Sequence, residues 1–188
     1  MKNKVSPRSI LGTVKGEHVY RLFYPQVPII VCAKSGNQVA AMPAVSFISV
    51  SDNPPLVALS IQRKSRTCLV IRSSRGFSAN WLSYNLIHKE YVLDLAKPSK
   101  SSNKLDERAI PYTLRSKTPV LDKAEAFMIC RVIRVISCSD HFLFLARVKS
   151  ARASKDFLLN KYWAYKKYKP MLYIGSYKAD PIRVLGSV

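Results

Sequence analysis

Two long apolar segments on either side of a short turn constrain the fold of this chain more than any other feature. Residues 125–137 and 141–153 each have the length and the β-branched content of a β-strand, and residues 138–140 between them predict a hairpin turn. In the second segment side chains alternate, and one face becomes basic toward its end at Arg147 and Lys149. This pattern predicts an antiparallel sheet.

The rest of the chain predicts further short strands, few helices and one domain. Strands are expected over residues 27–33, 38–50, 56–61, 76–81 and 171–174, with the first two joined in a hairpin. A short helix is expected over residues 68–71 with Ser65 as its N-cap, a longer helix over 82–95, and a loop over 97–104. No element is expected before residue 24. Several strands without repeated βαβ spacing predict a mainly β, antiparallel barrel formed by residues 1–188 as a single domain.

The composition excludes several classes of protein. The chain has 188 residues, 48% of them hydrophobic, which excludes intrinsic disorder despite a formal net charge of +20. Its 6 glycines form no G-x-G-x-x-G and no Walker A loop, so dinucleotide-binding Rossmann and P-loop folds are excluded. The longest apolar run is about seven residues, whereas a membrane span needs roughly 18. We therefore expect no membrane association, and a cytoplasmic location.

The cysteines and histidines predict no metal site. The four cysteines and three histidines lack C-x-x-C or H-x₃-H spacing. Cys32 and Cys130 lie inside apolar segments and are expected to be buried free thiols, which fits a reducing compartment. A pairing of Cys130 with Cys138 across the hairpin is the alternative.

Six short motifs follow one another in an order that is more specific than any one of them. In chain order they are Tyr24-Pro25-Gln26-Val27-Pro28, Ser46-Phe47-Ile48-Ser49-Val50-Ser51, Asn53-Pro54-Pro55-Leu56-Val57, Phe77-Ser78-Ala79-Asn80, Ser139-Asp140-His141-Phe142-Leu143-Phe144 and Pro170-Met171-Leu172-Tyr173-Ile174-Gly175. A strand ending in a basic Lys-Ser-Arg-Thr turn stands between the third and the fourth motif. Over residues 24–175 this order resembles the flavin reductase-like, FMN-binding split-barrel family, which includes flavoredoxins and short-chain flavin:NAD(P)H reductases.

The resemblance implies a fold, a cofactor and an activity. The fold would be a six-stranded antiparallel Greek-key split β-barrel with a few helices, working as a homodimer because the family builds its flavin cleft at the subunit interface. The cofactor would be FMN rather than FAD, and NAD(P)H would be the reductant. Electrons would pass to free flavin, a partner monooxygenase or another acceptor. A flavoredoxin-like electron carrier without efficient NAD(P)H turnover is the nearest variant.

The basic turn is the expected site for the flavin phosphate. Lys64, Ser65, Arg66 and Thr67 offer two cations, two hydroxyl groups and the exposed amides of a possible helix N-terminus, and such groups together bind anions. The alternative is an ordinary solvated turn that Ser65 caps. Ser60 and Gln62, just before the turn, are included in the expected cofactor site.

The small-residue strand before it is the expected platform for the flavin ring. Its expected contacts are Ala41, Met42, Pro43, Ala44, Ser46 and Phe47. A planar ring can lie against so little side chain and pair with backbone groups, although Pro43 lacks an N–H. The family usually carries Thr, Ser or Asn near the positions of Ala41 and Pro43, so this chain departs from the pattern there. A plain buried strand is the alternative.

Two further segments complete the expected site by resemblance. Phe77, Ala79, Asn80 and Trp81 match the segment that closes over the flavin, with the Asn80 side chain expected on the pyrimidine edge; core or dimer packing is the alternative for Trp81. His141 and Tyr173 match residues beside the nicotinamide cleft. Hydride transfer needs stacking and exclusion of water rather than a strong base. His141 is therefore expected to position the substrate or stabilise charge, unless it is only a capped surface residue.

The positive charge also allows a function of another class. Residues 161–169 interleave lysines with aromatic side chains, a composition that suits single-stranded nucleic acid. Positive potential would equally attract FMN and NAD(P)H, which are anions. A basic nucleic-acid-binding β-barrel is therefore the alternative to an FMN-dependent oxidoreductase.

Overall fold

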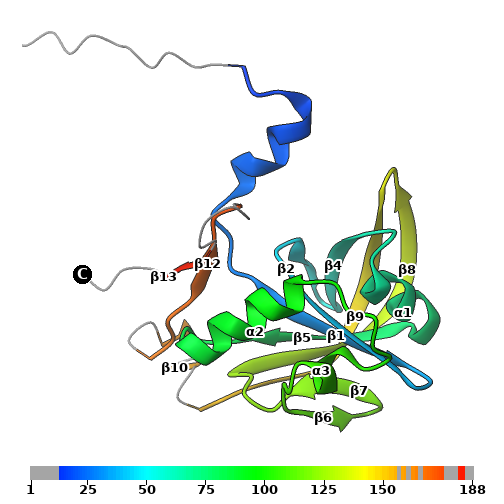
Figure 1. Cartoon of the computed structure of the whole chain (residues 1–188), viewed down its shortest axis with the longest axis vertical. Coiled ribbons are helices and arrows are strands. Elements are labelled where there is room, and N and C mark those ends of the chain that lie inside the picture. Colours follow the sequence, from blue (N-terminus) through cyan, green and yellow to red (C-terminus); the bar gives the residue numbers. More distant parts are fainter. Residues whose placement is uncertain (1–12, 156–157, 160–161, 165–166, 176–181, 185–188) are drawn as a thin grey trace, which may run out of the picture.

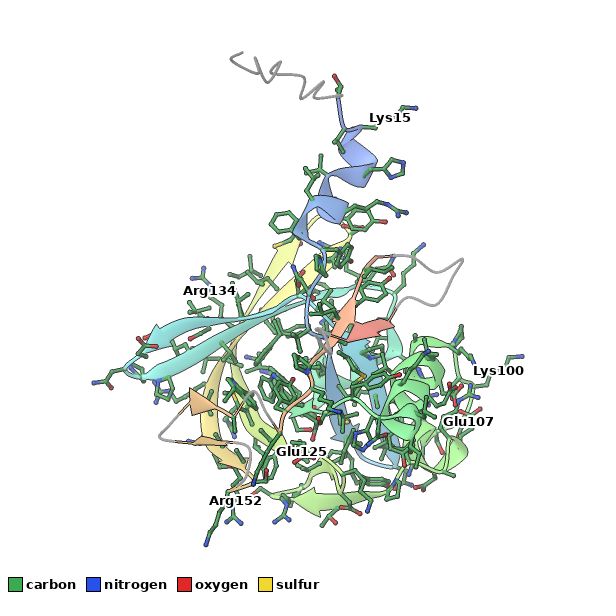
Figure 2. The ribbon with its side chains drawn as sticks, turned by 90° about the vertical axis from the view of Figure 1, so that its left-hand side faces the viewer. Lys15, Lys100, Glu107, Glu125, Arg134 and Arg152 are labelled. Atoms are coloured by element: carbon green, nitrogen blue, oxygen red, sulfur yellow. The ribbon has the colours of Figure 1, made fainter. Side chains whose placement is uncertain are left out.

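The fold is a curved antiparallel sheet with helix α1 (Arg66–Ser74) packed against its inner cluster and helices α2 (Leu86–Ala96) and α3 (Lys104–Glu107) packed on its outer face. It was obtained as a computed structural model that describes residues 13–155, 158–159, 162–164, 167–175 and 182–184. The 3₁₀-helix η1 (Gly16–Phe23) projects away from the body of the molecule, and Figure 2 shows Lys15 at its far end (Figure 1). The expectation of a mainly β, antiparallel protein is confirmed.

The sheet has seven strands in the order β2-β1-β5-β8-β9-β4-β3. Their bounds are Ile29–Ser35 for β1, Gln38–Ala44 for β2, Phe47–Asp52 for β3, Pro55–Gln62 for β4, Gly76–Trp81 for β5, Ala126–Cys138 for β8 and His141–Ala153 for β9. In the described part of the chain the edge strands β2 and β3 do not pair with each other. The expected six-stranded split barrel is therefore corrected in its strand number, because the sheet has seven strands and its two described edges are not hydrogen-bonded to each other.

The curvature follows from a two-residue connection between the two edges of the sheet. β2 ends at Ala44 and β3 begins at Phe47, so only Val45 and Ser46 join strands that lie at opposite ends of the strand order. The sheet must curl until these edges meet at one corner. The single strand expected over residues 38–50 was wrong, because the run of small and apolar residues contains this corner.

The curled sheet separates two hydrophobic clusters. The inner cluster takes alternate side chains of β1, including Val31, together with Leu59, Phe77, Phe144 and residues of helix α1. The outer cluster takes the other face of β1 and β2 and residues of α2 and α3 that cover it. Because Ile29 to Ala33 of β1 are buried on both faces of the sheet, these five residues are all apolar and do not alternate with polar residues.

The three α-helices of the described chain lie between strands: α1 follows β4, and α2 and α3 follow β5. Helix α1 (Arg66–Ser74) begins after Ser65, as expected, and extends beyond the predicted residues 68–71. Helix α2 (Leu86–Ala96) begins four residues later than expected because the side chain of Asn85 accepts a hydrogen bond from the His88 N–H (2.7 Å). Helix α3 (Lys104–Glu107) starts at the last residue of the expected loop.

Most of the remaining short strands were not predicted from the sequence. The hairpin of β6 (Tyr112–Arg115) and β7 (Thr118–Leu121) turns through Ser116 and Lys117, with φ of 49° and 67°. Glycine normally marks such a turn, and here it is absent. The remaining pairs are β10 (Leu158–Leu159) with β11 (Tyr162–Trp163) and β12 (Met171–Tyr173) with β13 (Ile182–Val184), of which only β12 was expected.

The long hairpin of β8 and β9 matches the expected one closely. Cys130 faces Val148 and Cys138 faces His141 in the strand register, so the alternative pairing of the two cysteines is excluded. Cys32 and Cys130 are buried free thiols, as expected. In the described part of the chain no cluster of three metal-ligating side chains occurs, and none of the helices has the length and apolarity to cross a membrane.

The structure describes two aromatic side chains of segment 161–169, of which Trp163 is exposed and Tyr168 is buried. The rings of Trp163 and Tyr168 stack with centroids 4.9 Å apart, and Tyr168 is buried against Ala126 and Trp81; Lys161, Tyr165 and Lys166 lie outside the described residues. Figure 2 places the labelled cations Lys100, Arg134 and Arg152 at well-separated points of the molecule. Burial of Tyr168 removes one of the rings expected to stack on bases, and the nucleic-acid alternative otherwise stays untested.

Candidate functional site

The basic turn between β4 and α1 presents an open helix N-terminus. The Ser65 N–H donates to the Gln62 carbonyl (3.0 Å), but its hydroxyl makes no cap and instead lies 3.4 Å from the Met42 sulfur. The first turn of α1 contains no acidic residue. Lys64 is exposed, and Arg66 is half-buried. Uncapped backbone N–H groups beside cations are groups that bind anions, and the phosphate site expected at this turn stays a prediction.

The loop before α3 lies against this turn. The Arg66 guanidinium donates to the Ser101 carbonyl, and the Val39 N–H donates to the Ser102 carbonyl (2.8 Å), so the loop borders both α1 and β2. Lys104 is buried and donates to the Leu95 carbonyl (2.7 Å). Burial, then the nearby Arg108 cation, lowers the pKa of Lys104. Thr67 is also buried, which leaves its backbone rather than its side chain for a ligand.

Ser46 fixes the corner between β2 and β3 to strand β4. Its hydroxyl donates to the Ser60 carbonyl (2.5 Å), and its carbonyl accepts from the Ser60 N–H (3.1 Å). Pro43 sits on the edge strand β2, where a missing N–H leaves no ladder bond unmade. Phe47 turns toward the inner cluster and contacts the ring edges of Phe77 and Trp81. The corner is therefore a rigid element.

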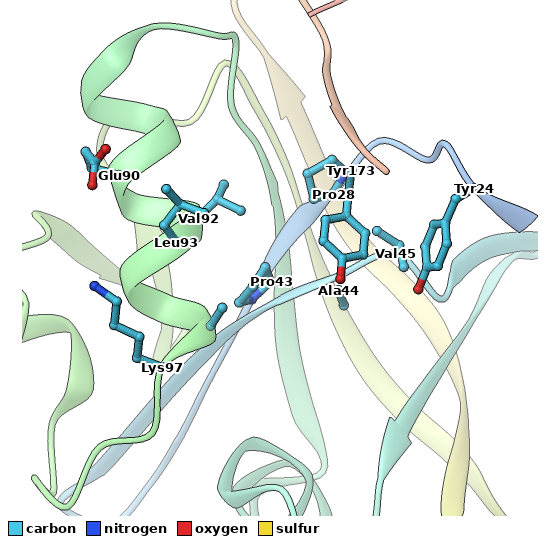
Figure 3. A pocket seen from close by; sticks show the side chains of 11 residues that line it. Tyr24, Pro28, Pro43, Ala44, Val45, Glu90, Val92, Leu93, Lys97 and Tyr173 are labelled. Atoms are coloured by element: carbon cyan, nitrogen blue, oxygen red, sulfur yellow. The ribbon is translucent and has the colours of Figure 1, made fainter. Parts of the chain in front are cut away.

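Two cavities flank this corner. The first has a volume of about 440 Å³ and lies between β2 and α2; its apolar walls include Pro43, Ala44, Leu93 and Tyr173 (Figure 3). The second, of about 350 Å³, is lined by Ser46, Ser60, Leu143 and residues of η1. Both volumes fall in the range of small-molecule sites.

His141 lies next to the basic turn. It pairs with Gln62 in the β4–β9 register, and its Nδ1 is 2.8 Å from Oδ1 of Asp140. That hydrogen bond holds the pKa of Asp140 below its ordinary value. Arg63 ties this hairpin end to the turn: its N–H donates to the Asp140 carbonyl (2.9 Å) and its Nε to the His141 carbonyl (3.3 Å). The His141 side chain is 41% exposed and so remains open to a ligand.

The β5 segment does not join this site through most of its side chains. Phe77 and Ala79 are fully buried in the inner cluster. Asn80 is fully buried on the other face, where it donates to the Ile30 carbonyl (2.9 Å) and accepts from the Leu121 N–H (3.1 Å). The side chain of Asn80 is thus bonded to β1 and β7, which corrects its expected place on a ligand edge. Trp81 is half-buried against Phe47.

The structure adds wall residues that the sequence analysis missed. Tyr24 and Val45 line both cavities, and α2 contributes Leu93 and Lys97 to the first. Tyr173, expected beside the cleft, lies in the first cavity with its ring edge-on to Tyr24, centroids 5.1 Å apart. The sequence placed Tyr24 only at the start of a proline-flanked strand, because its neighbour in space is 149 positions away.

Comparisons with known proteins identify the family to which the chain is similar. The sequence matches the flavin reductase like domain over residues 20–178. The chain belongs to this family. It is 26% identical over 142 residues to a flavin reductase of Pseudomonas putida, covering 73% of this chain and 80% of that protein. It is 26% identical over 170 residues to an uncharacterized protein of Aeropyrum pernix, of whose length it spans 61%.

Solved structures of the family share the fold. The FMN-binding protein of Thermus thermophilus aligns with a TM-score of 0.78 at 25% identity, covering 95% of this chain and 94% of that one. The flavin reductase HpaC aligns with a TM-score of 0.70 at 22% identity, over 88% and 93% of the two chains, which shows the fold alone. The resemblance deduced from the six motifs is therefore confirmed at the level of the family.

Proposed function

We propose that the protein is a flavin reductase that binds FMN and is reduced by NAD(P)H. The observation that carries this proposal is the uncapped N-terminus of α1, flanked by Lys64 and Arg66 and touching β2 through the contact of Ser65 with Met42. A phosphate-bearing ligand with a flat apolar ring suits a cationic turn next to an apolar corner with two cavities.

The residues present fit a flavin phosphate and ring. No side chain caps the N–H groups in the first turn of α1, so they can donate hydrogen bonds to a phosphate. The Lys64 ammonium is exposed and can contact the same phosphate. The corner from Pro43 to Ser46 offers backbone groups and small side chains. When bound, a flavin supplies an acceptor for a hydride at its ring.

The chain's own residues then orient the ligands and exclude water. Lys64, Arg66 and the amides of α1 hold the phosphate end, while Ala44, Val45 and Tyr173 surround the ring with apolar surface. His141, held by Asp140 and by Arg63, faces the second ligand and positions or balances its charge. No strong base is needed for this chemistry.

The remaining parts of the proposal concern partners and location. FMN is favoured over FAD because the open helix N-terminus accounts for one phosphate. The reductase component of a 4-nitrophenol monooxygenase from Rhodococcus opacus is 29% identical over 141 residues, which supports a monooxygenase or another electron acceptor as partner. A homodimer would cover Ile48 and Val50, which edge strand β3 leaves exposed. A reducing, cytoplasmic location suits the free thiols.

The visible spectrum of the purified full chain tests the proposal. A yellow protein with a band near about 450 nm is expected, followed by anaerobic bleaching with NADH or NADPH. Colour without bleaching by either donor would favour the flavoredoxin-like carrier. A colourless protein that gains no absorption band with excess FMN, and whose oligonucleotide affinity falls steeply with salt, would replace the flavin proposal by the nucleic-acid alternative.

A further inference from the structure

The outer face of the β8–β9 hairpin carries a row of arginines. Val132 and Ala146 belong to the inner cluster, and side chains alternate along a strand, so their neighbours point to the outer face. Four exposed cations lie on that face: Arg131, Arg134, Arg147 and Arg152. We call these four residues the arginine row, and Figure 2 labels Arg134 and Arg152 toward its two ends. Helices α2 and α3 cover β1 and β2 and leave this half of the outer face open.

Two members of the row stand directly opposite each other. Arg131 pairs with Arg147 in the strand register, and on the outer sides of this pair lie Gly76 and Leu56, neither of which is acidic. Like charges at directly opposite positions destabilise a sheet. Within the described residues none of the four arginines forms an ion pair. Asp140 is the only acidic residue between positions 126 and 153, and it is bonded to His141. The row therefore lacks a counter-charge that an anionic group from outside would supply.

Apolar side chains lie among these cations. Ile133 and Ile136 of β8 are 44% and 36% exposed, and Leu145, opposite Arg134, is half-buried. Lys149 is the only lysine of the two strands. Protein–protein interfaces are enriched in arginine and depleted in lysine, with apolar side chains at their centre. The composition of this face is thus typical of a surface that binds another protein.

Two other occupants fit the face less well. The major groove of DNA admits a two-stranded ribbon, but β9 pairs with β4 over residues 141–147 and β8 pairs with β5 over residues 126–131, so the row lies on a broader sheet. A second copy of the chain, related by a twofold axis through this face, would bring arginines against arginines. Charge and shape together favour an acidic protein.

We propose that the arginine row is a docking site for an acidic, partly apolar surface of another protein. Opposite charge steers such a partner toward a chain with a formal net charge of +20. Ile136 pairs with Leu143, and Leu143 lines the cavity of about 350 Å³. A protein docked over Arg134 and Ile136 would therefore border the candidate site, although the docking itself does not depend on the proposed function.

Binding of labelled acidic peptides to the full chain tests the docking site. In one peptide glutamate alternates with leucine, and in the other serine replaces each leucine, so both carry the same charge. Arg131→Gln combined with Arg147→Gln should weaken binding of the glutamate–leucine peptide by about fivefold or more. Lys15→Gln combined with Lys123→Gln removes two exposed cations elsewhere and is the control. Equal losses in the two double variants would overturn the proposal, because net charge alone would then explain the binding.

Two further measurements identify the occupant. The wild type should prefer the glutamate–leucine peptide to the glutamate–serine peptide, and Ile133→Ser combined with Ile136→Ser should abolish that preference. A single-stranded oligothymidylate is the nucleic-acid probe. If the arginine variant loses more affinity for this probe than for the peptide, nucleic acid is the occupant and the proposal is overturned. A different oligomeric state of the arginine variant in sedimentation would make a second copy the occupant, with the same consequence.

Thermal unfolding separates docking from a role of the row in the fold. Arg147→Gln removes the repulsion from Arg131, so the midpoint of the free protein should rise by about 1–3 °C. A lower midpoint would show that the row stabilises the fold and would overturn the docking role. These readouts need no flavin, so a colourless wild type would remove the flavin reductase proposal and leave the docking site to be decided by the peptides.

Discussion

The turn from Gln62 to Thr67 and strand β5 show how differently two matched motifs of one family serve a protein. Both were expected to contact the flavin. In the turn the N-terminal amides of α1 are uncapped and Lys64 is exposed. In β5 the polar side chain of Asn80 is buried and hydrogen-bonded to β1 and β7. A motif thus identifies the family, but only the hydrogen-bond partners of its side chains tell whether it serves the ligand or the fold.

Removal of Asn80 should give the largest effect on stability. Asn80→Ala leaves the Leu121 N–H and the Ile30 carbonyl without their partner, which should destabilise the protein by about 2–4 kcal/mol. Urea unfolding measures it, with the exposed N-cap variant Asn85→Ala, expected to cost about 1 kcal/mol, as the control. The folded fraction should keep its FMN affinity. Intact stability with lost FMN affinity would show that Asn80 serves the ligand after all.

Substitutions in the basic turn should instead lower the affinity for FMN and leave the stability of the protein nearly unchanged. Lys64→Ala combined with Arg66→Ala removes two cations from the proposed phosphate site, so FMN affinity should fall by about tenfold to a hundredfold. Fluorescence titration measures it, and riboflavin, which lacks the phosphate, should bind both proteins equally. Arg115→Ala combined with Lys117→Ala, two exposed cations of the β6–β7 hairpin, controls for the loss of two positive charges. Equal losses for riboflavin and FMN would move the phosphate site elsewhere.

Alkaline pH should lower the free energy of unfolding, because two buried thiols are kept neutral in the folded protein. Burial raises the pKa of Cys32 to about 12, and Cys32 lies 3.7 Å from the Asn80 amide nitrogen. The folded state keeps this thiol neutral while the unfolded chain ionises it above about 9, so stability is complete below that pH and falls above it, by about 1.4 kcal/mol per thiol for each pH unit. Cys130, with a pKa also raised to about 12 by burial, adds to the slope. Urea midpoints between pH 8 and pH 11 measure it, and Cys32→Ala should flatten the curve; an unchanged slope in that variant contradicts the assignment.

The smallest effect is expected at Ser65. An N-cap serine usually contributes about 1 kcal/mol, but here its hydroxyl makes only a weak contact with the Met42 sulfur. Ser65→Ala should therefore change the free energy of unfolding by less than about 0.5 kcal/mol in the absence of flavin. Denaturation with and without saturating FMN measures the difference. A loss near the usual value without flavin would mean that Ser65 caps α1.

The sequence predicted the fold best where side chains alternate and the partner strand is close in the chain. The β8–β9 hairpin follows this pattern. The corner at Val45 and Ser46 has no glycine or proline to mark it, and the hairpin turn at Ser116 and Lys117 uses positive φ without glycine. Both depend on tertiary contacts that a single sequence does not display.

The site was predictable where chemistry resides in one short segment. Two cations and two hydroxyl groups within the turn at 64–67, together with the order of the motifs, indicated an anion site there, which stays a prediction. The direction of Asn80 depends on which face of β5 is covered by β7, and the place of Tyr24 in the cavity walls depends on packing against the distant Tyr173. Such long-range packing decides whether a side chain meets a ligand, and periodicity within a segment does not contain it.

The two-residue connection between β2 and β3 also determines where the chain tolerates a change of length. One extra residue between Val45 and Ser46 would displace the Ser46–Ser60 hydrogen bonds or shift β3 by one place against β4, which exchanges the two faces of that strand. Ser116 and Lys117, exposed at the tip of a peripheral hairpin, carry no such restriction. An affinity tag or fluorescent label is therefore best inserted at this tip. An insertion of the same length at the β2–β3 corner would disrupt the sheet.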